Sequence, residues 1–390
     1  MAKHLLNDAK VAALLRVLNV EKDSTRIVGG AVRNALLDEP IGDIDFATKI
    51  LPQRVSELCE AAGFKAVPTG IEFGTVTIVI NKQPFEVTTL REDIETNGRH
   101  AVVKFGTSWE KDAARRDFTI NALYLDADGN VHAPIGGLDD IKARRVCFIG
   151  EAQTRIREDY LRIWRFFRFF AQYGEGDLDN EGLRACMQER KGLAGLSAER
   201  VRQELFKLLN APRAAEAIEA MRENGLTTDI LGVQRIARFK KYVAGNNEPT
   251  ALNRLAALCV WTNNDADLLS ARLKLSRAEE RQLNDLASTG IKLRTQPDEK
   301  QARVLLYHYL QVYDAAIKIA SAGNEEGWKD LIKLPQRHPV PEFPVKGADL
   351  IALGYSQGPE LGEVLKRLEQ KWIGSDFSLP QDALLKFARN

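Results

Sequence analysis

Residues 27–48 read IVGGAVRNALLDEPIGDIDFAT, and this stretch decides how the first part of the chain folds. The pair Gly29-Gly30 opens a segment that we predict to be a helix. Glycine has no Cβ, so backbone N–H groups here can approach an anion closely, and the helix start adds a favourable dipole. The stretch therefore predicts a phosphate-binding turn.

An Asp-x-Asp pair follows on a predicted strand. Asp43 and Asp45 are two residues apart, so on a strand both carboxylates face the same side. Such oxygen ligands suit hard divalent cations, typically Mg²⁺. Each signal is weak alone, because Gly-Gly turns are common and an Asp-x-Asp pair is usually a solvated turn. Together, and with Arg33 available for a phosphate, they predict phosphoryl or nucleotidyl transfer.

The motif resembles the opening of the DNA polymerase β nucleotidyltransferase superfamily. More narrowly, GGAVRN and GDIDFAT are similar to motifs of class II tRNA nucleotidyltransferases (CCA-adding enzymes) and bacterial poly(A) polymerases. The family usually has Asp after GGxVR, where this chain has the uncharged Asn34. Asn34 can still accept a hydrogen bond, so we interpret it as a tolerated variation.

Composition limits the class of protein. The 390 residues contain 55 Lys and Arg against 54 Asp and Glu, a net charge of +1, so any RNA contact must come from local basic patches. Four well-separated cysteines and no CxxC pair favour reduced thiols in a cytosolic protein. No apolar run approaches the roughly 20 residues of a membrane span, so we expect a soluble, cytoplasmic protein without a membrane partner.

The pattern along the chain predicts an α+β protein. Residues 1–150 form a catalytic head with a small mixed or antiparallel sheet, including a hairpin of 75–80 with 85–90 and strands at 101–105 and 122–125. Residues 91–99 are charged and contain Asn97-Gly98, which suggests a mobile loop. After about residue 152 only helical periodicity remains. We expect a neck (151–212), a body (213–334) and a tRNA-binding tail (335–390), with breaks at 173–180, 244–250 and 335–347.

A second motif is RRDFTINAL, residues 115–123. A tripeptide Arg-Arg-Asp is usually a surface charge cluster, but here it runs directly into an apolar segment. The motif resembles RRDxTINAL of the same family. The resemblance implies that Arg116 binds triphosphate oxygens and that Asp117 accepts from a ribose hydroxyl.

A third motif begins at Glu158-Asp159 and continues through Arg162, Arg165 and Arg168. On one α-helix Asp159 and Arg162 would be near neighbours, with the aromatic residues on the opposite, core-facing arc. An Asp acceptor beside an Arg donor matches the Watson–Crick edges of cytosine and adenine and mismatches uracil and guanine. The stretch resembles the EDxxR motif with which class II enzymes select CTP and ATP without a nucleic-acid template.

The resemblance implies a two-metal mechanism. Asp43 and Asp45 would coordinate two Mg²⁺ ions, and Glu86 is our candidate third carboxylate, although it could equally be a solvent-facing strand residue. Residues 92–100 would help to switch the pocket from C to A. We expect triphosphate contacts from Gly29, Gly30 and Arg33, base contacts from Asp159 and Arg162, and nearby roles for Arg165 and Arg168.

Weaker similarities complete the pattern. PIGGLDDIKARRV (134–146) resembles the DPxGGxxDL segment, with Ala133 where the family has Asp, and SAERVRQELFKLL (197–209) resembles a helical segment that we interpret as structural. Residues 347–370 are similar to the tail of many family members. No His-Asp pair occurs, so an added phosphohydrolase activity is unsupported.

The predicted function is template-independent addition of C, C and A to the 3′ end of tRNA from CTP and ATP, with release of pyrophosphate. The helical arm would grip the tRNA acceptor stem and elbow mainly through phosphates, and no obligate protein partner is implied. The alternatives are a poly(A) polymerase, a CC-only or A-only tRNA enzyme, and a non-catalytic RNA-binding protein.

Overall fold

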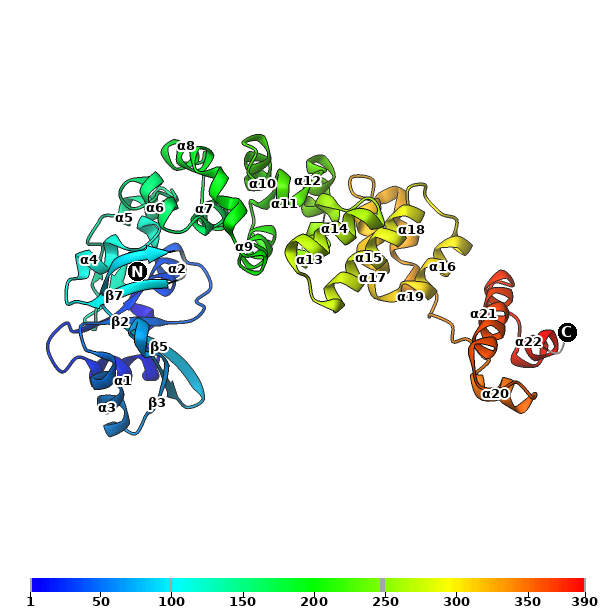
Figure 1. Cartoon of the computed structure of the whole chain (residues 1–390), viewed down its shortest axis with the longest axis horizontal. Coiled ribbons are helices and arrows are strands. Elements are labelled where there is room, and N and C mark those ends of the chain that lie inside the picture. Colours follow the sequence, from blue (N-terminus) through cyan, green and yellow to red (C-terminus); the bar gives the residue numbers. More distant parts are fainter. Residues whose placement is uncertain (1, 98–99, 246–249, 389–390) are drawn as a thin grey trace. The chain divides into compact units, whose positions relative to one another are not determined.

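The computed structural model describes residues 2–97, 100–245 and 250–388. The chain divides into two compact units, Met1–Asp229 and Ile230–Asn390, which are described separately. All strands belong to the first unit and appear in blue and cyan in Figure 1. The predicted head and neck lie within the first unit and the predicted tail within the second, while the finer division into four parts stays a prediction.

The head contains a seven-stranded sheet in the order β3-β4-β5-β2-β1-β8-β9. Neighbouring strands are antiparallel except for the parallel pair of β2 and β5, so the sheet is mixed, as predicted. Its strands are β1 (Thr25–Val28), β2 (Asp45–Thr48), β3 (Lys65–Gly70), β4 (Thr75–Ile80), β5 (Gln83–Thr89), β8 (Tyr124–Leu125) and β9 (Val131–His132).

The predicted hairpin is confirmed as β4 and β5. Asn81 and Lys82 form its turn with φ of 48° and 67°, the left-handed conformation that a two-residue hairpin loop requires. Buried and partly buried residues alternate along β4, which puts Val76 and Ile78 in the core.

The prediction of a loop over residues 91–99 is wrong for its described part. β6 (Arg91–Asn97) and β7 (His100–Phe105) form a separate two-stranded antiparallel sheet, and residues 98–99 lie outside the described residues. Asn-Gly is itself a strong hairpin signal, and its strand partner was already predicted at 101–105. The strand predicted at 122–125 is shortened to β8, because a 3₁₀ turn occupies Thr119–Asn121.

Helices of the first unit cover the sheet and continue beyond it. One of them, α7 (Leu161–Tyr173), packs against α9 and α10 and buries Trp164, Phe166 and Phe167, as its aromatic arc predicts. The helices and 3₁₀ turns are η1 (Ala2–Asn7), α1 (Ala9–Leu18), α2 (Gly30–Leu37), α3 (Pro52–Ala61), η2 (Ile71–Phe73), α4 (Trp109–Ala114), η3 (Thr119–Asn121), α5 (Leu138–Lys142), α6 (Ala152–Glu158), α7, α8 (Asn180–Gln188), η4 (Arg190–Gly195), α9 (Ala198–Asn210), α10 (Ala214–Glu223) and α11 (Thr228–Leu231), which reaches into the second unit.

The second unit is helical throughout its described residues. α14, α15 and α16 each begin with a capping box. The side chain of the N-cap residue accepts from the backbone N–H three residues later, and the side chain of that later residue accepts from the N-cap backbone N–H. The elements are α12 (Ile236–Ala244), α13 (Ala251–Cys259), α14 (Asn263–Leu273), α15 (Arg277–Lys292), α16 (Glu299–His308), α17 (Leu310–Ala320), η5 (Glu326–Trp328), α18 (Lys329–Ile332), α19 (Leu334–Arg337), α20 (Gly347–Ala352), α21 (Pro359–Gly374) and α22 (Gln381–Ala388).

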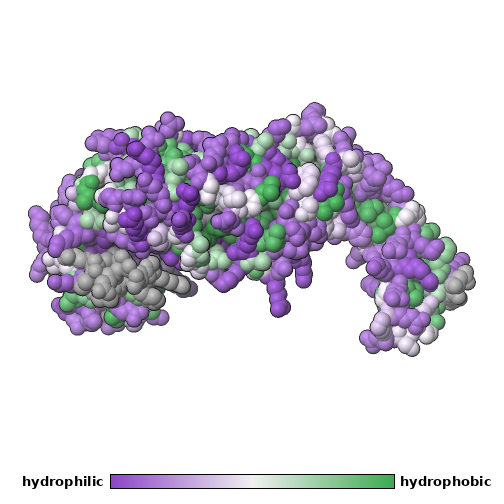
Figure 2. All heavy atoms as spheres, turned by 45° about the horizontal axis from the view of Figure 1, so that its top comes forward, coloured by the Kyte–Doolittle hydropathy of each residue, from purple (hydrophilic) through white to green (hydrophobic). Residues whose placement is uncertain are grey.

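The predicted breaks are present in the described chain. α7 ends at Tyr173 and α8 begins at Asn180, while residues 338–346 are irregular and separate α19 from α20. Part of the break at 244–250 lies outside the described residues. Among the residues that the structure describes, no helix has the length and apolar character of a membrane span. On the face drawn in Figure 2, hydrophilic residues predominate and hydrophobic ones form separate patches.

Candidate active site

The glycine turn places a helix start at the site. Gly29 follows β1 and is the N-cap of α2, with φ of 72°, a backbone conformation that residues with a side chain rarely adopt. A Cβ on Gly29 would lie 3.5 Å from Nη1 of Arg116, so this glycine also permits the close approach of a second motif. The predicted helix after Gly29-Gly30 is therefore confirmed, and its first turn lies beside the RRD segment.

The two aspartates of the Asp-x-Asp pair differ in position. Asp45 is the first residue of β2, opposite Val28 of β1, whereas Asp43 precedes the strand and is exposed. The strand rule that put both carboxylates on one face thus does not apply to Asp43. The parallel register Phe46↔Val87 places Glu86 of β5 level with Asp45, and Glu86 is also exposed.

Asp45 lies in negative surroundings. Burial, the charge of Glu86 and the charge of Asp43 together raise the pKa of Asp45 to about 6, and Arg116 only partly opposes them. Within the described residues the Asp45 carboxylate makes no hydrogen bond or ion pair. A carboxylate in this state has its oxygens available for a cation.

Among the residues that the structure describes, no preformed cluster of three metal ligands includes Asp45. Among the described residues, the group whose ligand atoms lie within 4.8 Å of one another is Asp23, Asp126 and His132. These side chains already have partners, since Arg26 donates to Asp23 at 2.6 Å and His132 contacts Asp126 at 2.7 Å. The donor set at Asp45, which consists of carboxylates only, still fits the oxygen preference of Mg²⁺.

One pocket of about 480 Å³ joins the three motifs. Of the predicted site residues, only Asp43, Glu86 and Arg168 are not among its lining. The lining consists of Val28, Gly29, Gly30, Arg33, Asp45, Arg115, Arg116, Asp117, Asn121, Asp159, Leu161, Arg162, Arg165, Phe169 and Arg200. Its six arginines and three aspartates give it a formal excess of three positive charges, which suits a polyanionic ligand.

Arg33 is buried against neutral partners. Its guanidinium donates to Tyr173 at 2.7 Å and to Asn121, and lies 4.1 Å from the Tyr173 ring centroid. Burial lowers its pKa, and no carboxylate forms an ion pair with it among the described residues. The Asn34 amide oxygen accepts from Arg33 Nη2 at 2.8 Å, so Asn34 gives a hydrogen bond without a neutralising charge. The positive charge of Arg33 therefore remains available to an anion.

The buried carboxylate of Asp112 holds Arg116 in place. Asp112 is 1% exposed and accepts from Arg115 at 2.8 Å, from Arg116 at 3.1 Å and from the Tyr124 hydroxyl at 2.8 Å. Burial alone would raise the pKa of Asp112, but the charges of Arg116 and Arg115 hold it below its usual value. Asp112 thus fixes both arginines where they line the pocket.

Asp117 is also held by neighbouring donors. Arg165 donates its Nε to Asp117 at 2.7 Å, and Asn121 donates its side-chain N–H at 2.9 Å. Despite burial, Arg165 and these hydrogen bonds lower the pKa of Asp117. Asp117 therefore enters the pocket as an ionised, oriented acceptor.

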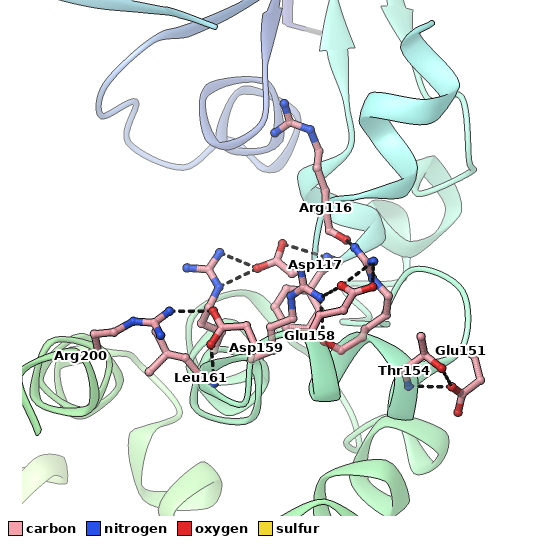
Figure 3. A network of polar contacts seen from close by, with 12 residues as sticks. Arg116, Asp117, Glu151, Thr154, Glu158, Asp159, Leu161 and Arg200 are labelled. Atoms are coloured by element: carbon pink, nitrogen blue, oxygen red, sulfur yellow. Dashed lines mark hydrogen bonds and ion pairs between the residues drawn. The ribbon is translucent and has the colours of Figure 1, made fainter. Parts of the chain in front are cut away.

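The prediction that Asp159 and Arg162 share one helix is wrong. α6 ends at Glu158, Asp159 is extended with φ of −156°, and α7 begins at Leu161. Asp159 accepts from the Leu161 N–H at 3.1 Å and from Arg200 at 2.7 Å (Figure 3). Arg162 pairs with Glu158 and donates to the Arg155 carbonyl at 2.7 Å. Both residues still line the pocket, and the Arg162 N–H donates to the Asp159 carbonyl at 3.0 Å.

Arg168 lies outside the lining of the pocket. Its Nε is 2.6 Å from the buried carboxylate of Glu204, and its guanidinium lies 3.9 Å from the Phe169 ring centroid. Its predicted contact with the nucleotide stays a prediction.

Sequence reasoning missed four polar or aromatic members of the pocket. Arg115 and Asn121 belong to the RRDFTINAL motif, so they could have been included with Arg116. Arg200 lies in a segment interpreted as structural, and Phe169 lies on α7 in contact with Arg165 and Arg168. No local sequence signal connects Arg200 or Phe169 to the pocket, because they come together only in the folded chain. The four missed lining residues are Arg115, Asn121, Phe169 and Arg200.

An unpaired carboxylate beside a glycine turn and an arginine-rich pocket fit the transfer of a nucleotide from a triphosphate, and the family match agrees that the class is a nucleotidyltransferase. Residues 25–147 match the family described as Poly A polymerase head domain, and residues 177–233 match the probable RNA and SrmB-binding site of polymerase A.

Full-length relatives narrow the class. The chain is 35% identical over 389 residues to the mouse (Mus musculus) protein named CCA tRNA nucleotidyltransferase 1, mitochondrial, covering 97% of this chain and 89% of that protein. This chain therefore belongs to the CCA tRNA nucleotidyltransferase family and is an enzyme of the CCA-adding type.

Solved structures agree with this assignment. The Bacillus stearothermophilus CCA-adding enzyme in complex with CTP is 28% identical, with a TM-score of 0.70 over 95% of this chain and 93% of that one. The Thermotoga maritima CCA-adding enzyme complexed with tRNA is 19% identical, with a TM-score of 0.69 over 99% and 97% of the two chains, and shows the shared fold.

Proposed function

We propose that the chain adds C, C and A to the 3′ end of tRNA with Asp43 and Asp45 as ligands of two Mg²⁺ ions. The observation that carries this proposal is the unpaired Asp45 carboxylate in a pocket with six arginines. Bound Mg²⁺ would activate the RNA 3′-hydroxyl and neutralise charge on the departing pyrophosphate. Glu86 is level with Asp45 across β2 and β5, so it is the proposed third carboxylate.

Residues of the first two motifs bind the triphosphate in this proposal. Gly29 and Gly30 line the pocket without side chains. The Gly29 N–H donates to the Leu123 carbonyl at 2.9 Å, so the N–H groups offered to the triphosphate are those of the first turn of α2, from Gly30 onward. Arg33 and Arg116 bring positive charge to the same pocket. Asp112 keeps Arg116 oriented, which reduces the entropy lost when phosphate binds. Asp117 accepts from the ribose hydroxyl.

The third motif selects the base. Asp159 has one oxygen bonded to the Leu161 N–H and the other to Arg200, and a carboxylate offers about four acceptor sites, so it can still accept from a base amino group. Arg162 donates to the ring nitrogen beside that amino group. Cytosine and adenine satisfy this pair, while uracil and guanine leave its polar atoms unpaired.

The helical arm contacts tRNA, at the acceptor stem and elbow. Support comes from the printed description of the family matched over residues 177–233 and from the tRNA complex of the Thermotoga maritima relative. The proposed C-to-A switch by residues 92–100 concerns side chains outside the described part of the chain. The cytoplasm stays the predicted compartment; the mouse relative is named as mitochondrial, so family membership alone does not fix it.

The test offers tRNA transcripts that lack CCA, CA or A, together with CTP, ATP or both, and measures product length. Three additions followed by arrest support CCA addition. A long A ladder would indicate polyadenylation, and arrest after two C residues or addition of A alone would indicate a partial enzyme. Absence of any extension would contradict the proposed function and favour a non-catalytic protein.

A further inference from the structure

Trp261 differs from the other tryptophans of the chain. It follows α13 in the second unit and is 39% exposed, whereas Trp109, Trp164, Trp328 and Trp372 are each at most 7% exposed. An exposed indole ring leaves apolar area in contact with water, which is unfavourable, and it can stack on a ligand that covers this area. The surroundings of Trp261 indicate what could cover it.

Three arginines gather around this ring. The guanidinium carbons of Arg235, Arg294 and Arg238 lie 4.3, 5.0 and 5.6 Å from the Trp261 ring centroid. None of the three forms an ion pair with a carboxylate in the part of the chain that the structure describes. Cation–π attraction holds these charges over the ring. The result is a partly exposed indole covered in part by guanidinium groups whose charges have no carboxylate partner among the described residues.

Backbone contacts fix two of these arginines. Arg238 donates to the carbonyls of Ala257, Ala256 and Val260 at 2.6 to 2.9 Å, and Arg294 donates to the Trp261 carbonyl at 3.2 Å. Asp265 is the acidic group that influences Arg238, but its oxygen already accepts from the N–H of Trp261 at 3.0 Å. The carboxylate therefore orders the Trp261 backbone, and the guanidinium groups keep their net positive charge.

A hollow lies beside the ring. It has a volume of about 290 Å³ and is formed by small and apolar side chains of α12, α13, α15 and α17, with Lys241 as a further cation. None of its lining residues in the described part of the chain is acidic. This combination of aromatic ring, apolar hollow and cations matches the way proteins bind one unstacked base with its flanking phosphates.

We infer that Trp261 is a stacking platform for one unpaired nucleotide of the RNA substrate. The base stacks on the exposed part of this indole and guanidinium surface, beside the hollow, and Arg235, Arg294 and Lys241 bind the flanking phosphates. Several cations around one ring favour a polyanionic strand over a small mono-anion. The inference rests on tRNA being the substrate, and it adds a contact with a base to an arm otherwise expected to bind phosphates by shape.

Intrinsic fluorescence tests the site directly, because Trp261 is the one solvent-accessible tryptophan. Titration of the full chain with tRNA is expected to quench the emission, and the quench is expected to vanish in Trp261→Phe. Trp261→Phe keeps an aromatic ring and should retain most of the affinity. Trp261→Leu keeps apolar bulk but cannot stack, so it should weaken tRNA binding by about 5- to 30-fold without changing kcat.

Leu268→Ala is the matched control, because Leu268 is 45% exposed on α14 of the same unit. It should leave tRNA affinity unchanged, and thermal unfolding of all variants checks that they fold. If the wild type adds CCA but Trp261→Leu binds tRNA as tightly as the wild type, the inference about Trp261 is wrong and the proposed function still holds.

A second titration separates the remaining outcomes. If the wild type extends no tRNA, the proposed function fails. Titration with a single-stranded oligouridylate then tests the inference by itself: quenching of Trp261 emission supports it, and no quenching contradicts it. AMP that quenches as tightly as tRNA would overturn it in favour of a small-anion site. Arg294→Gln should reduce the salt dependence of tRNA binding by slightly less than one unit of slope, and an unchanged slope would contradict the phosphate contact.

Discussion

Asp45 and Asp159 line the same pocket in opposite surroundings. Asp45 has no hydrogen bond among the described residues, and burial together with Glu86 and Asp43 raises its pKa to about 6. Asp159 accepts from the Leu161 N–H and from Arg200. One acid is left unpaired and the other is held in place.

The difference separates two kinds of functional carboxylate. An unpaired acid near other acids is destabilised in the empty protein and gains most from an added cation, so it suits metal binding. An acid held by an arginine has a fixed direction and suits hydrogen-bond recognition, where geometry gives specificity. Each prediction below perturbs one side of this comparison.

Asp45→Ala should have the largest effect. Loss of the metal-binding carboxylate should reduce nucleotide incorporation by at least about 10³-fold, because charge stabilisation at the reacting phosphate is lost. Single-turnover assays with labelled CTP measure this, and filter binding should show unchanged tRNA affinity. Asp139→Ala removes a 93% exposed acid from the same unit and serves as the control. Normal turnover by Asp45→Ala would contradict the metal assignment.

Glu86→Gln should be the next most severe. Removal of its charge should slow incorporation by about 10²-fold if Glu86 is the third carboxylate. The same change should lower the pKa of Asp45, because Glu86 is the largest charge that raises it. A pH–rate profile measures both. A lowered pKa with an unchanged rate would make Glu86 an electrostatic neighbour and not a ligand.

Arg162→Ala tests the base-reading side. Discrimination of CTP and ATP against UTP and GTP should fall by about 10- to 100-fold, because the donor that rejects the wrong bases is removed. The ratio of kcat/KM values measures the change. Arg157→Ala is a suitable control, since Arg157 lies on the preceding helix, is 58% exposed and pairs with Glu189. Unchanged selectivity would remove Arg162 from base recognition.

Arg200→Met tests whether Asp159 depends on Arg200 for its orientation. Without the 2.7 Å contact, Asp159 should lose its fixed orientation, and KM for CTP and ATP should rise by about tenfold with a smaller change in kcat. Arg184→Met, at an exposed position on α8, is the matched control. Equal KM values in wild type and Arg200→Met would show that Leu161 alone positions Asp159.

Asp45→Asn should give the smallest effect, on stability. The pKa of Asp45 is raised in the folded protein, so the folded state binds this proton more tightly, and stability falls as pH rises between about 4 and 6. Without metal at pH 7.5, Asp45→Asn should therefore be more stable than wild type by about 1–2 kcal/mol, a value reduced for partial solvation.

Thermal unfolding at pH 4 and pH 7.5 measures this difference, which should nearly vanish at pH 4. Added Mg²⁺ should stabilise the wild type and leave Asp45→Asn unchanged. If the wild type is as stable as Asp45→Asn at pH 7.5 without metal, the ionised Asp45 carboxylate does not destabilise the folded protein, and the raised pKa of Asp45 is wrong.

Local patterns predicted much of the fold. The helix after Gly29-Gly30, the hairpin of β4 and β5 and the helical remainder depend on neighbouring residues, whose effects act over one or two turns of chain. The errors were local too. Asn97-Gly98 was interpreted as a loop although it is a hairpin signal, and the break at Asp159 has neither Gly nor Pro to mark it.

The sequence by itself determined which residues carry the chemistry: glycines for a phosphate turn, carboxylates for a cation, and an Asp with an Arg for a base. Only the tertiary structure decided which of these charges are paired. Arg200 reaches Asp159 across 41 residues, and Tyr173 reaches Arg33 across 140. Coulombic and hydrogen-bond energies depend on distance in space, and a linear pattern does not contain that distance.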